Sequence, residues 1–202
     1  AAQFTNSPLN SDFQGYTRYV NTKGAAISRL QQSLASAKNS NDSTAITTEM
    51  RNLNQEIIDY RTNYNKTSSA NFLNALFAAL QEPVVPPANQ HPKGAYDSSY
   101  AFNYFKSHYW DGVKFNDDRL IRTPFYEARI DRYLRDMVSP DPDSIKKEID
   151  IILGQAVSSK ESFKYLLTHF VQKYINPEYM GQDAVFVHLF EKYINGNPEV
   201  NW

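Results

Sequence analysis

The sequence predicts an all-α protein. Apolar residues recur at intervals of three and four over most of the 202-residue chain, and this spacing places them on one face of a helix. The alternation of apolar and polar residues that a half-buried β-strand produces is not found. Prolines and clusters of Asn, Asp and Ser separate the periodic segments, as they do at helix ends. We therefore expect a long antiparallel helical hairpin followed by a compact multi-helix bundle.

Two long periodic segments predict the hairpin. Within residues 13–37 and 46–64, apolar side chains follow a seven-residue repeat, so each segment carries one apolar seam, which only Lys23 interrupts. The seam positions are Phe13, Tyr16, Val20, Lys23, Ile27, Leu30, Leu34 and Ala37, followed by Ile46, Met50, Leu53, Ile57, Tyr60 and Tyr64. The connector at residues 39–42 consists of turn and capping residues. A short connector between two such helices predicts an antiparallel pair.

A short third helix and a proline-rich segment should follow the hairpin. Residues 72–80 form an apolar cluster, for which Ser68 and Ser69 are the candidate N-cap residues. Residues 83–94 contain four of the ten prolines, which lack an amide donor and have a fixed φ, so this segment should be extended. We accordingly assign residues 1–81 to the hairpin and the third helix, 82–96 to a Pro-rich linker and 97–202 to a helical bundle.

Capping residues and apolar spacing predict the helices of the bundle. Thr123 and Pro124 suit the N-cap and first position of one helix, and Asp141 suits the N-cap of the next. Ser158 and Glu161 have the spacing of a capping box in front of an amphipathic segment. We expect helices within 96–110, over 124–138, over 145–156, over 163–174 and over 181–194.

Composition excludes several classes of function. Hydrophobic residues make up 41% and charged residues 21%, which is typical of a folded globular protein. With 21 basic and 22 acidic residues, the chain has no charge excess that would favour nucleic acid or an anionic membrane. Its longest apolar runs are too short for a transmembrane segment. The absence of cysteine excludes disulfides, thiolate catalysis and Cys-based zinc sites from this chain.

Two groups of residues could carry metal or acid-base chemistry. His188 and Glu191 lie three residues apart on the last predicted helix, the spacing of carboxylate-histidine metal sites, but the sequence offers no second matching pair. We therefore expect no metal and no cofactor, and a hydrogen-bonded structural role for His188. The acidic loop with Asp111, Asp117 and Asp118 does not have the spacing of a calcium loop. We expect Asp117 or Asp118 to cap a turn and to pair with the neighbouring Arg119, and we expect no catalytic residue.

A second expectation concerns buried charge. Arg122 lies between Ile121 and the predicted helix start at Thr123, beside apolar neighbours. We expect Arg119 or Arg122 to form a buried ion pair with a carboxylate such as Asp183, which would hold this loop to the last helix.

The aromatic residues from Tyr96 to Tyr133 have two interpretations. Their rings could pack into the core, which their spacing favours, or they could line a groove on which a ligand stacks. The candidates for such a groove are Tyr100, Tyr104, Tyr109 and Trp110.

Two stretches mix charged and apolar residues in an unusual way and carry a resemblance. These signature stretches are residues 116–125, NDDRLIRTPF, and 180–189, MGQDAVFVHL. With residues 100–110 and the Asp143-Ser144-Ile145 segment, they resemble a helical domain of unknown function from bacterial cell-envelope proteins. That domain directly precedes the thioredoxin-like domain of thiol-disulfide oxidoreductases of the TlpA-like, AhpC/TSA class. The resemblance covers about residues 70–202.

The resemblance implies a periplasmic or cell-envelope protein, often anchored as a lipoprotein, whose redox Cys pair lies downstream of this chain. No catalytic residue is carried over, because this chain has no cysteine. Our first hypothesis is therefore a non-catalytic module that serves as spacer, dimerisation element or client-recognition element. Its partners would be the downstream thioredoxin-like domain and a second copy of the chain or a protein client.

Two other hypotheses remain open. The second is an independent module that binds a peptide or a glycan in an aromatic-lined groove of the second half. The third, which we favour least, is a hydrolytic or metal-dependent enzyme built on His188, Glu191 and the acidic loop.

Overall fold

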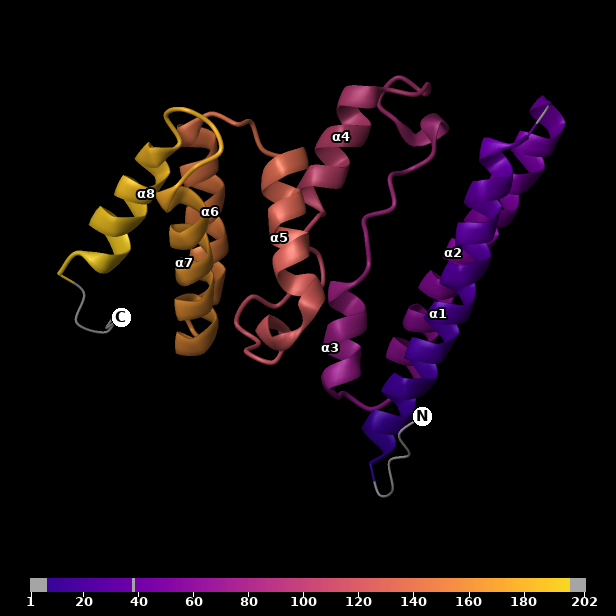
Figure 1. Cartoon of the computed structure of the whole chain (residues 1–202), viewed down its shortest axis with the longest axis horizontal. Helices are drawn as coiled ribbons and strands as arrows, with labels where there is room; N and C mark the ends of the chain where they lie inside the picture. The colour runs from indigo at the N-terminus through magenta and orange to yellow at the C-terminus, as the bar shows by residue number, and fades with distance from the viewer. Residues whose placement is uncertain (1–6, 38, 197–202) are drawn as a thin grey trace. The chain divides into compact units, whose positions relative to one another are not determined.

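The computed structural model describes residues 7–37 and 39–196 and confirms the all-α class, since these residues form helices and no strand (Figure 1). The chain divides into two compact units, residues 1–81 and 82–202. None of the described helices combines the length and the apolar content that crossing a membrane requires.

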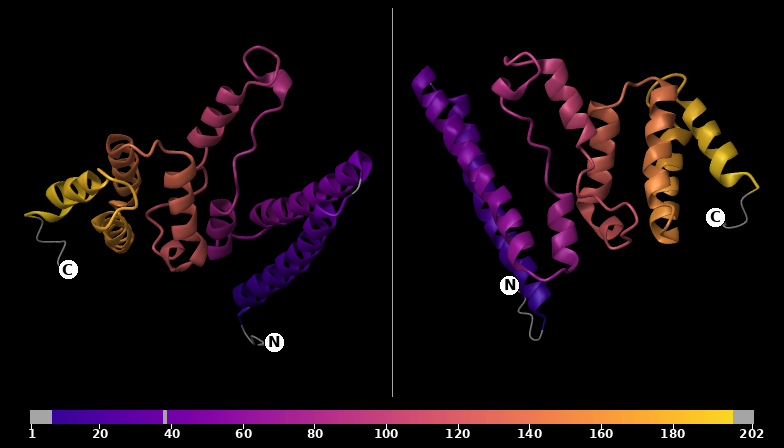
Figure 2. Two further views of the ribbon diagram at one scale, coloured as in Figure 1. Left: turned by 45° about the horizontal axis from the view of Figure 1, so that its top comes forward. Right: turned by 180° about the vertical axis from the view of Figure 1, so that it is seen from behind.

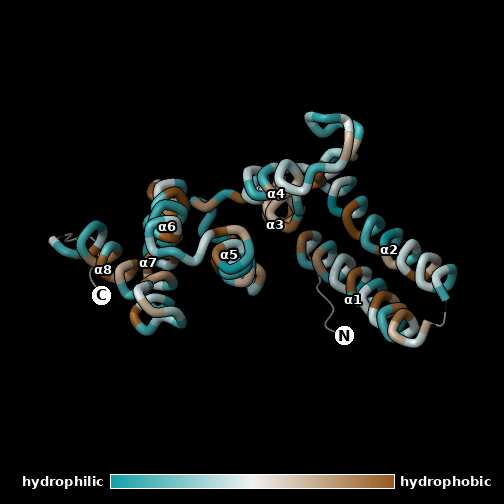
Figure 3. The backbone as a smooth tube through the Cα atoms, turned by 90° about the horizontal axis from the view of Figure 1, so that it is seen from above, coloured by the Kyte–Doolittle hydropathy of each residue, from teal (hydrophilic) through white to brown (hydrophobic). Residues whose placement is uncertain are grey.

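Unit 1 contains the predicted hairpin. Helices α1 (Pro8–Ala35) and α2 (Ser40–Thr67) lie side by side and antiparallel (Figures 1 and 2). Asn39 caps α2 by accepting a hydrogen bond from the Asp42 amide at 2.8 Å. Lys23, the charged residue of the seam, pairs with Glu56 of α2. Hydrophobic positions recur along both helices (Figure 3).

The third helix, α3 (Phe72–Ala79), closes the hairpin at one end. Its Phe77 is fully buried in an aromatic cluster with three tyrosines, at ring-centroid distances of 4.5 Å to Tyr16, 5.1 Å to Tyr64 and 6.4 Å to Tyr60. Along the hairpin seam only Tyr16 and Ile57 are buried, because a helix with a single neighbour covers only part of its apolar face. The aromatic cluster is therefore the main core of unit 1.

The cap of α3 differs from the prediction. Asn71, not Ser68 or Ser69, is the N-cap, and its side chain accepts hydrogen bonds from the amides of Leu73 and Asn74. Helix α2 continues to Thr67, so Ser68 becomes the residue that ends α2. Asn71 is the N-cap because α3 begins at Phe72, which leaves Ser69 too far from the first helical residue to cap it.

Unit 2 begins with the proline-rich segment, which is not helical apart from a short 3₁₀ turn at Ala88–Gln90. His91 is buried, and its Nδ1 accepts a hydrogen bond from the Asp97 amide at 3.0 Å. Nε2 therefore carries the proton and donates to the Pro86 carbonyl at 2.9 Å. The imidazole thus fixes the approach to α4 (Ser98–Ser107), a role that the sequence analysis did not assign to it.

The remaining helices are α5 (Pro124–Asp136), α6 (Pro142–Ala156), α7 (Lys160–Ile175) and α8 (Asp183–Leu189), followed by a π-helical turn at Phe190–Ile194. Asp141 caps α6 as predicted. Thr123 does occupy the N-cap position of α5, but its hydroxyl donates to the Leu120 carbonyl instead of capping. The predicted capping box at Ser158 is wrong by one residue, because Ser159 is the residue that accepts the Ser162 amide.

Candidate binding pocket

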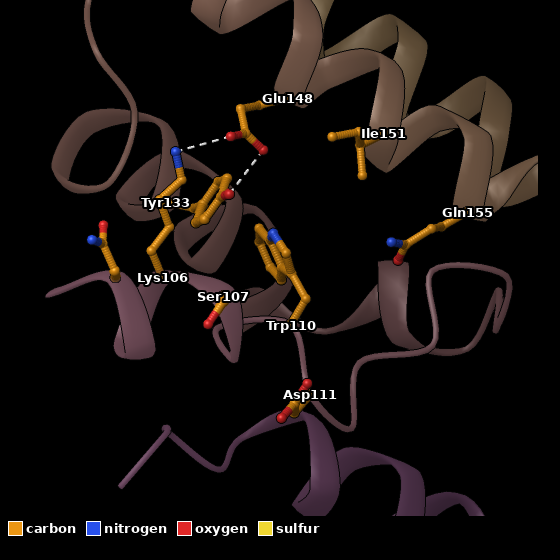
Figure 4. Close-up of a pocket in the computed structure, with 9 residues that line it drawn as sticks. Lys106, Ser107, Trp110, Asp111, Tyr133, Glu148, Ile151 and Gln155 are labelled. Carbon is orange, nitrogen blue, oxygen red and sulfur yellow. Dashed lines mark hydrogen bonds and ion pairs between the residues drawn. The ribbon is translucent and has the colours of Figure 1, made fainter. Parts of the chain in front are cut away.

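An open pocket of about 460 Å³ lies in unit 2, among α4, α5, α6 and the loop after α4 (Figure 4). Its size falls within the range of small-molecule sites. The pocket is lined by Asn103, Lys106, Ser107, Trp110, Asp111, Tyr133, Glu148, Ile151 and Gln155.

The α4 side of the pocket follows one helical face. Asn103, Lys106 and Ser107 are spaced by three and four residues, and Trp110 continues that spacing just beyond the helix end. The indole of Trp110 packs against Phe115 and Tyr133, with ring centroids 5.0 Å and 4.8 Å away. These contacts hold the ring in place at the pocket.

The α6 side follows a second face. Glu148, Ile151 and Gln155 are spaced by three and four residues. Other positions of α6, such as Ile149 and Leu153, are fully buried in the core of the unit, so the helix is fixed on its apolar side and presents these three residues to the pocket. Ile151 remains 44% exposed although it is apolar.

Glu148 connects the two sides. One carboxylate oxygen accepts a hydrogen bond from the Lys106 ammonium at 2.9 Å, and the other accepts from the Tyr133 hydroxyl at 2.9 Å (Figure 4). Burial, together with the bond to Glu148, raises the pKa of Tyr133, so its hydroxyl stays protonated and donates. With both oxygens engaged, Glu148 is suited to fix the pocket wall rather than to exchange a proton with a ligand.

The charge of the pocket is small and negative. One ammonium, of Lys106, faces two carboxylates, of Asp111 and Glu148, which leaves a formal charge of minus one. The ammonium also lies 6.0 Å from the centre of the Tyr133 ring. The Glu148 carboxylate and the ring of Tyr133, which an incoming cation could contact together, are thus already occupied by the protein's own lysine.

Of the four aromatic residues proposed for a groove, Trp110 lines the pocket. Tyr109 is 1% exposed and donates to the Arg129 carbonyl at 3.1 Å, so it belongs to the core. Tyr100 packs on His91, and Tyr104 stacks on His108 at a centroid distance of 4.0 Å. Tyr100 contacts Tyr104 at a centroid distance of 6.0 Å and Tyr109 contacts Trp110 at 4.8 Å, but of the four rings only Trp110 lines the pocket.

The arginines of the first signature stretch differ from our expectation of a buried pair. Arg119 binds Asp117 at 2.6 Å, and Arg122 binds Glu161 at 3.0 Å. Their side chains are 54% and 71% exposed. A carboxylate two residues away is easier for Arg119 to reach than Asp183, which is the exposed first residue of α8. Hydrogen bonds from Arg119 hold the pKa of Asp117 below its usual range.

Asp118, the next acidic residue, is half-buried. The His188 side chain is hydrogen-bonded, since its Nε2 lies 2.9 Å from Asp150 of α6. Lys192 and Tyr193 also bind Asp150, each at 2.7 Å. A π-helical turn has more residues per turn than an α-helix, so it can bring residues four and five positions after His188 to the same carboxylate.

These contacts fasten α8 and the π-helical turn after it to α6. Although partial burial raises the pKa of Asp150, hydrogen bonds from Lys192, Tyr193 and His188 outweigh that effect, and the net pKa lies below its ordinary value. Glu191, proposed as a partner of His188, is exposed. Within residues 7–37 and 39–196, no three His, Asp or Glu side chains lie close enough together to hold a metal ion.

Sequence reasoning missed most of the pocket. It assigned no role to Lys106 or Glu148, whose ion pair forms the hydrogen-bonded wall together with the Tyr133 hydroxyl. The spacing of the lining residues on α4 and on α6 could have marked one polar face on each helix. It could not have shown that these two faces meet.

Comparison with known proteins identifies a family. A family model described as a domain of unknown function (DUF5106) matches residues 38–201, which include α2 to α8 and every residue of the pocket. No curated protein and no solved structure matches the chain.

Proposed function

We propose, from the premise that the chain belongs to the DUF5106 family of domains of unknown function, that it is a non-catalytic recognition module of a cell-envelope thiol-disulfide oxidoreductase. In this proposal, unit 2 binds a ligand or a client in the pocket beside Trp110. A redox Cys pair outside this chain carries out the chemistry.

The pocket is the observation that carries the proposal. A fixed indole, an ion pair that holds the opposite wall and a rim of amide, hydroxyl and carboxylate groups form a preorganised binding surface. The half-buried carboxylate of the pocket lining, Glu148, accepts hydrogen bonds through both of its oxygens. These features suit recognition better than acid-base catalysis.

The parent protein and its compartment follow from the resemblance of the signature stretches. We propose an extracytoplasmic protein, anchored by lipid in its full-length form, with a thioredoxin-like domain after this module. Unit 1 then acts as a spacer. Its two helices have 28 residues each, which corresponds to a length of about 42 Å.

The recognition role can be tested by blocking the pocket. The labelled chain is mixed with sedimented bacterial cell-envelope fragments, and the bound fraction is measured against chain concentration. Ile151→Arg places a long side chain in the pocket, and Val157→Arg is the matched control at the residue directly after the same helix, where the side chain is 68% exposed and outside the pocket. We expect saturable binding that Ile151→Arg weakens by at least about tenfold and that Val157→Arg leaves intact. Equal binding by the two variants, or no saturable binding by the unmodified chain, would refute the proposal.

The parent protein can be tested separately. The coding sequence after residue 202 should encode a thioredoxin-like domain with a Cys-x-x-Cys motif. A coding sequence without such a domain would reject the oxidoreductase and leave the pocket to be explained otherwise.

The second candidate function is an independent peptide- or glycan-binding module. It is favoured by the fact that all residues lining the pocket lie between positions 103 and 155, so unit 2 supplies the whole site. The coding sequence distinguishes this candidate from the first one, because an independent module needs no redox domain.

A further inference from the structure

We infer that the ligand of the pocket is a neutral carbohydrate, with one sugar ring lying on the indole of Trp110. This inference rests on the proposed recognition role and names its ligand class. It follows from the charge, the polarity and the shape of the lining.

Charge argues against ionic ligands. Two carboxylates against one ammonium repel an anion such as a phosphate or a sugar acid. A cation would be attracted, but Lys106 already occupies the position between Glu148 and the ring of Tyr133. At Glu148, an incoming ammonium or guanidinium would have to displace Lys106 and leave one positive charge without its partner. A neutral ligand incurs neither cost.

Polarity argues against an apolar ligand. Six of the nine lining side chains end in a hydrogen-bonding group other than a ring hydroxyl or indole: Asn103, Lys106, Ser107, Asp111, Glu148 and Gln155. Lys106, Ser107 and Glu148 already form hydrogen bonds within the protein. An apolar molecule would still remove water from the exposed Asn103, Asp111 and Gln155 without replacing its hydrogen bonds. A sugar hydroxyl both donates and accepts, so neighbouring hydroxyls can satisfy amide, hydroxyl and carboxylate groups together.

The apolar part of the lining fits the other side of a sugar ring. Trp110 supplies a flat apolar face, and Ile151 lies on the α6 side of the pocket (Figure 4). The ring of a pyranose exposes C–H groups on its faces, which can lie against such a surface while its hydroxyls point to the rim. A volume of about 460 Å³ accommodates about one to two sugar rings.

A neutral peptide backbone is the competing ligand, because it also carries donors and acceptors. It presents them along an extended line and needs recesses for its side chains. Here the polar groups surround a single indole, and Ile151 is the one aliphatic residue of the lining. This arrangement favours a ring with hydroxyls around its edge.

Binding can be measured through Trp110 itself. The chain has two tryptophans, and Trp202→Phe in the full chain leaves Trp110 as the only indole. This variant is titrated with glucose, maltose, N-acetylglucosamine and chitobiose as neutral sugars. Glucuronate, N-acetylarginine amide and N-acetyl-Gly-Ala-Gly amide represent an anion, a cation and a neutral peptide. We expect a saturable change in Trp110 emission with at least one neutral sugar, with a dissociation constant of about 0.1–10 mM for so small a ligand.

Rim variants connect the signal to the pocket without touching the core. Asn103→Ala and Gln155→Ala should each weaken sugar binding by about three- to tenfold, the effect of one lost hydrogen bond. Gln172→Ala, on an exposed position of α7 outside the pocket, is the matched control and should have no effect. Far-UV circular dichroism establishes that each variant is folded.

Three results would overturn the inference. They are the absence of binding by every neutral sugar, sugar binding that the rim variants leave unchanged, and stronger binding of the peptide or of either charged probe. If the peptide binds and the rim variants weaken it, the carbohydrate is wrong and the recognition role stands. If, in addition, Ile151→Arg retains full binding to envelope fragments, the recognition role fails as well.

Discussion

Replacing Asp131 by Asn tests how unit 2 holds α5 to α7. The Asp131 carboxylate lies 3.2 Å from His169 Nε2 and accepts a hydrogen bond from the Lys173 ammonium at 3.0 Å, and both partners belong to α7. The hydrogen bond with His169, together with Lys173, lowers the pKa of Asp131 from 3.8 to about 2, against the opposing effect of partial burial.

The pKa shift of Asp131 gives the magnitude of its contribution to stability. A fall from 3.8 to about 2 corresponds to about 2.4 kcal/mol of stability at neutral pH. The side chain is 36% exposed, and water weakens such an interaction, so we expect about 1 kcal/mol. Because the pKa in the folded state lies below that of the unfolded state, this contribution is complete above about pH 4 and disappears as the pH falls towards about 2.

The assay is urea unfolding followed by Trp110 emission in the Trp202→Phe background, because Trp110 packs on Tyr133 of α5 and reports on unit 2. Asp131→Asn should be less stable than the parent at pH 7 by about 1 kcal/mol, and the two should converge near pH 2. Asp143→Asn, whose side chain is 93% exposed, serves as the control and should change little. A difference in the free energy of unfolding between Asp131→Asn and the parent that stays constant with pH, or no difference at pH 7, would refute the reasoning.

Three further predictions concern packing, capping and the contacts of Asp150. Phe77→Ala should destabilise unit 1 by about 3–5 kcal/mol, because Phe77 is fully buried; hydrogen exchange of the α2 amides measures this, and unchanged protection would contradict it. Asn71→Ala should cost about 0.5–2 kcal/mol through loss of the α3 cap, and α3 amides that exchange no faster would argue against that role. Tyr193→Phe should cost about 1 kcal/mol in urea unfolding through loss of its bond to Asp150, whereas Tyr179→Phe, at a 59% exposed position, should cost nothing; equal effects would reject the assignment.

The N-cap residues show how precisely a helix start can be predicted from the local sequence. Asp141 was predicted correctly because a proline after it leaves one register for the helix start. At Ser68 and Ser158 several polar residues stand next to one another, and each could cap. The extent of the neighbouring helices then selects Asn71 and Ser159. Where the alternatives differ by less than a typical capping energy, packing decides between them.

The helices, the hairpin and the absence of thiol chemistry from this chain could all be predicted from the amino-acid sequence. These properties depend on residue spacing within one segment, or on composition, so no knowledge of distant contacts is needed. The signature stretches also pointed to a domain of unknown function, and the family match over residues 38–201 agrees with that part of the resemblance.

The contacts between residues of different helices could not be predicted in this way. Lys106 and Glu148 lie on different helices, and no spacing in the sequence predicts their contact across the pocket. The same holds for His188 and Asp150, and for the division of the aromatic residues into a buried Tyr109 and a pocket-lining Trp110. Spacing shows which side chains share a face, but the partner of that face is set by how the helices pack, which is a property of the whole unit.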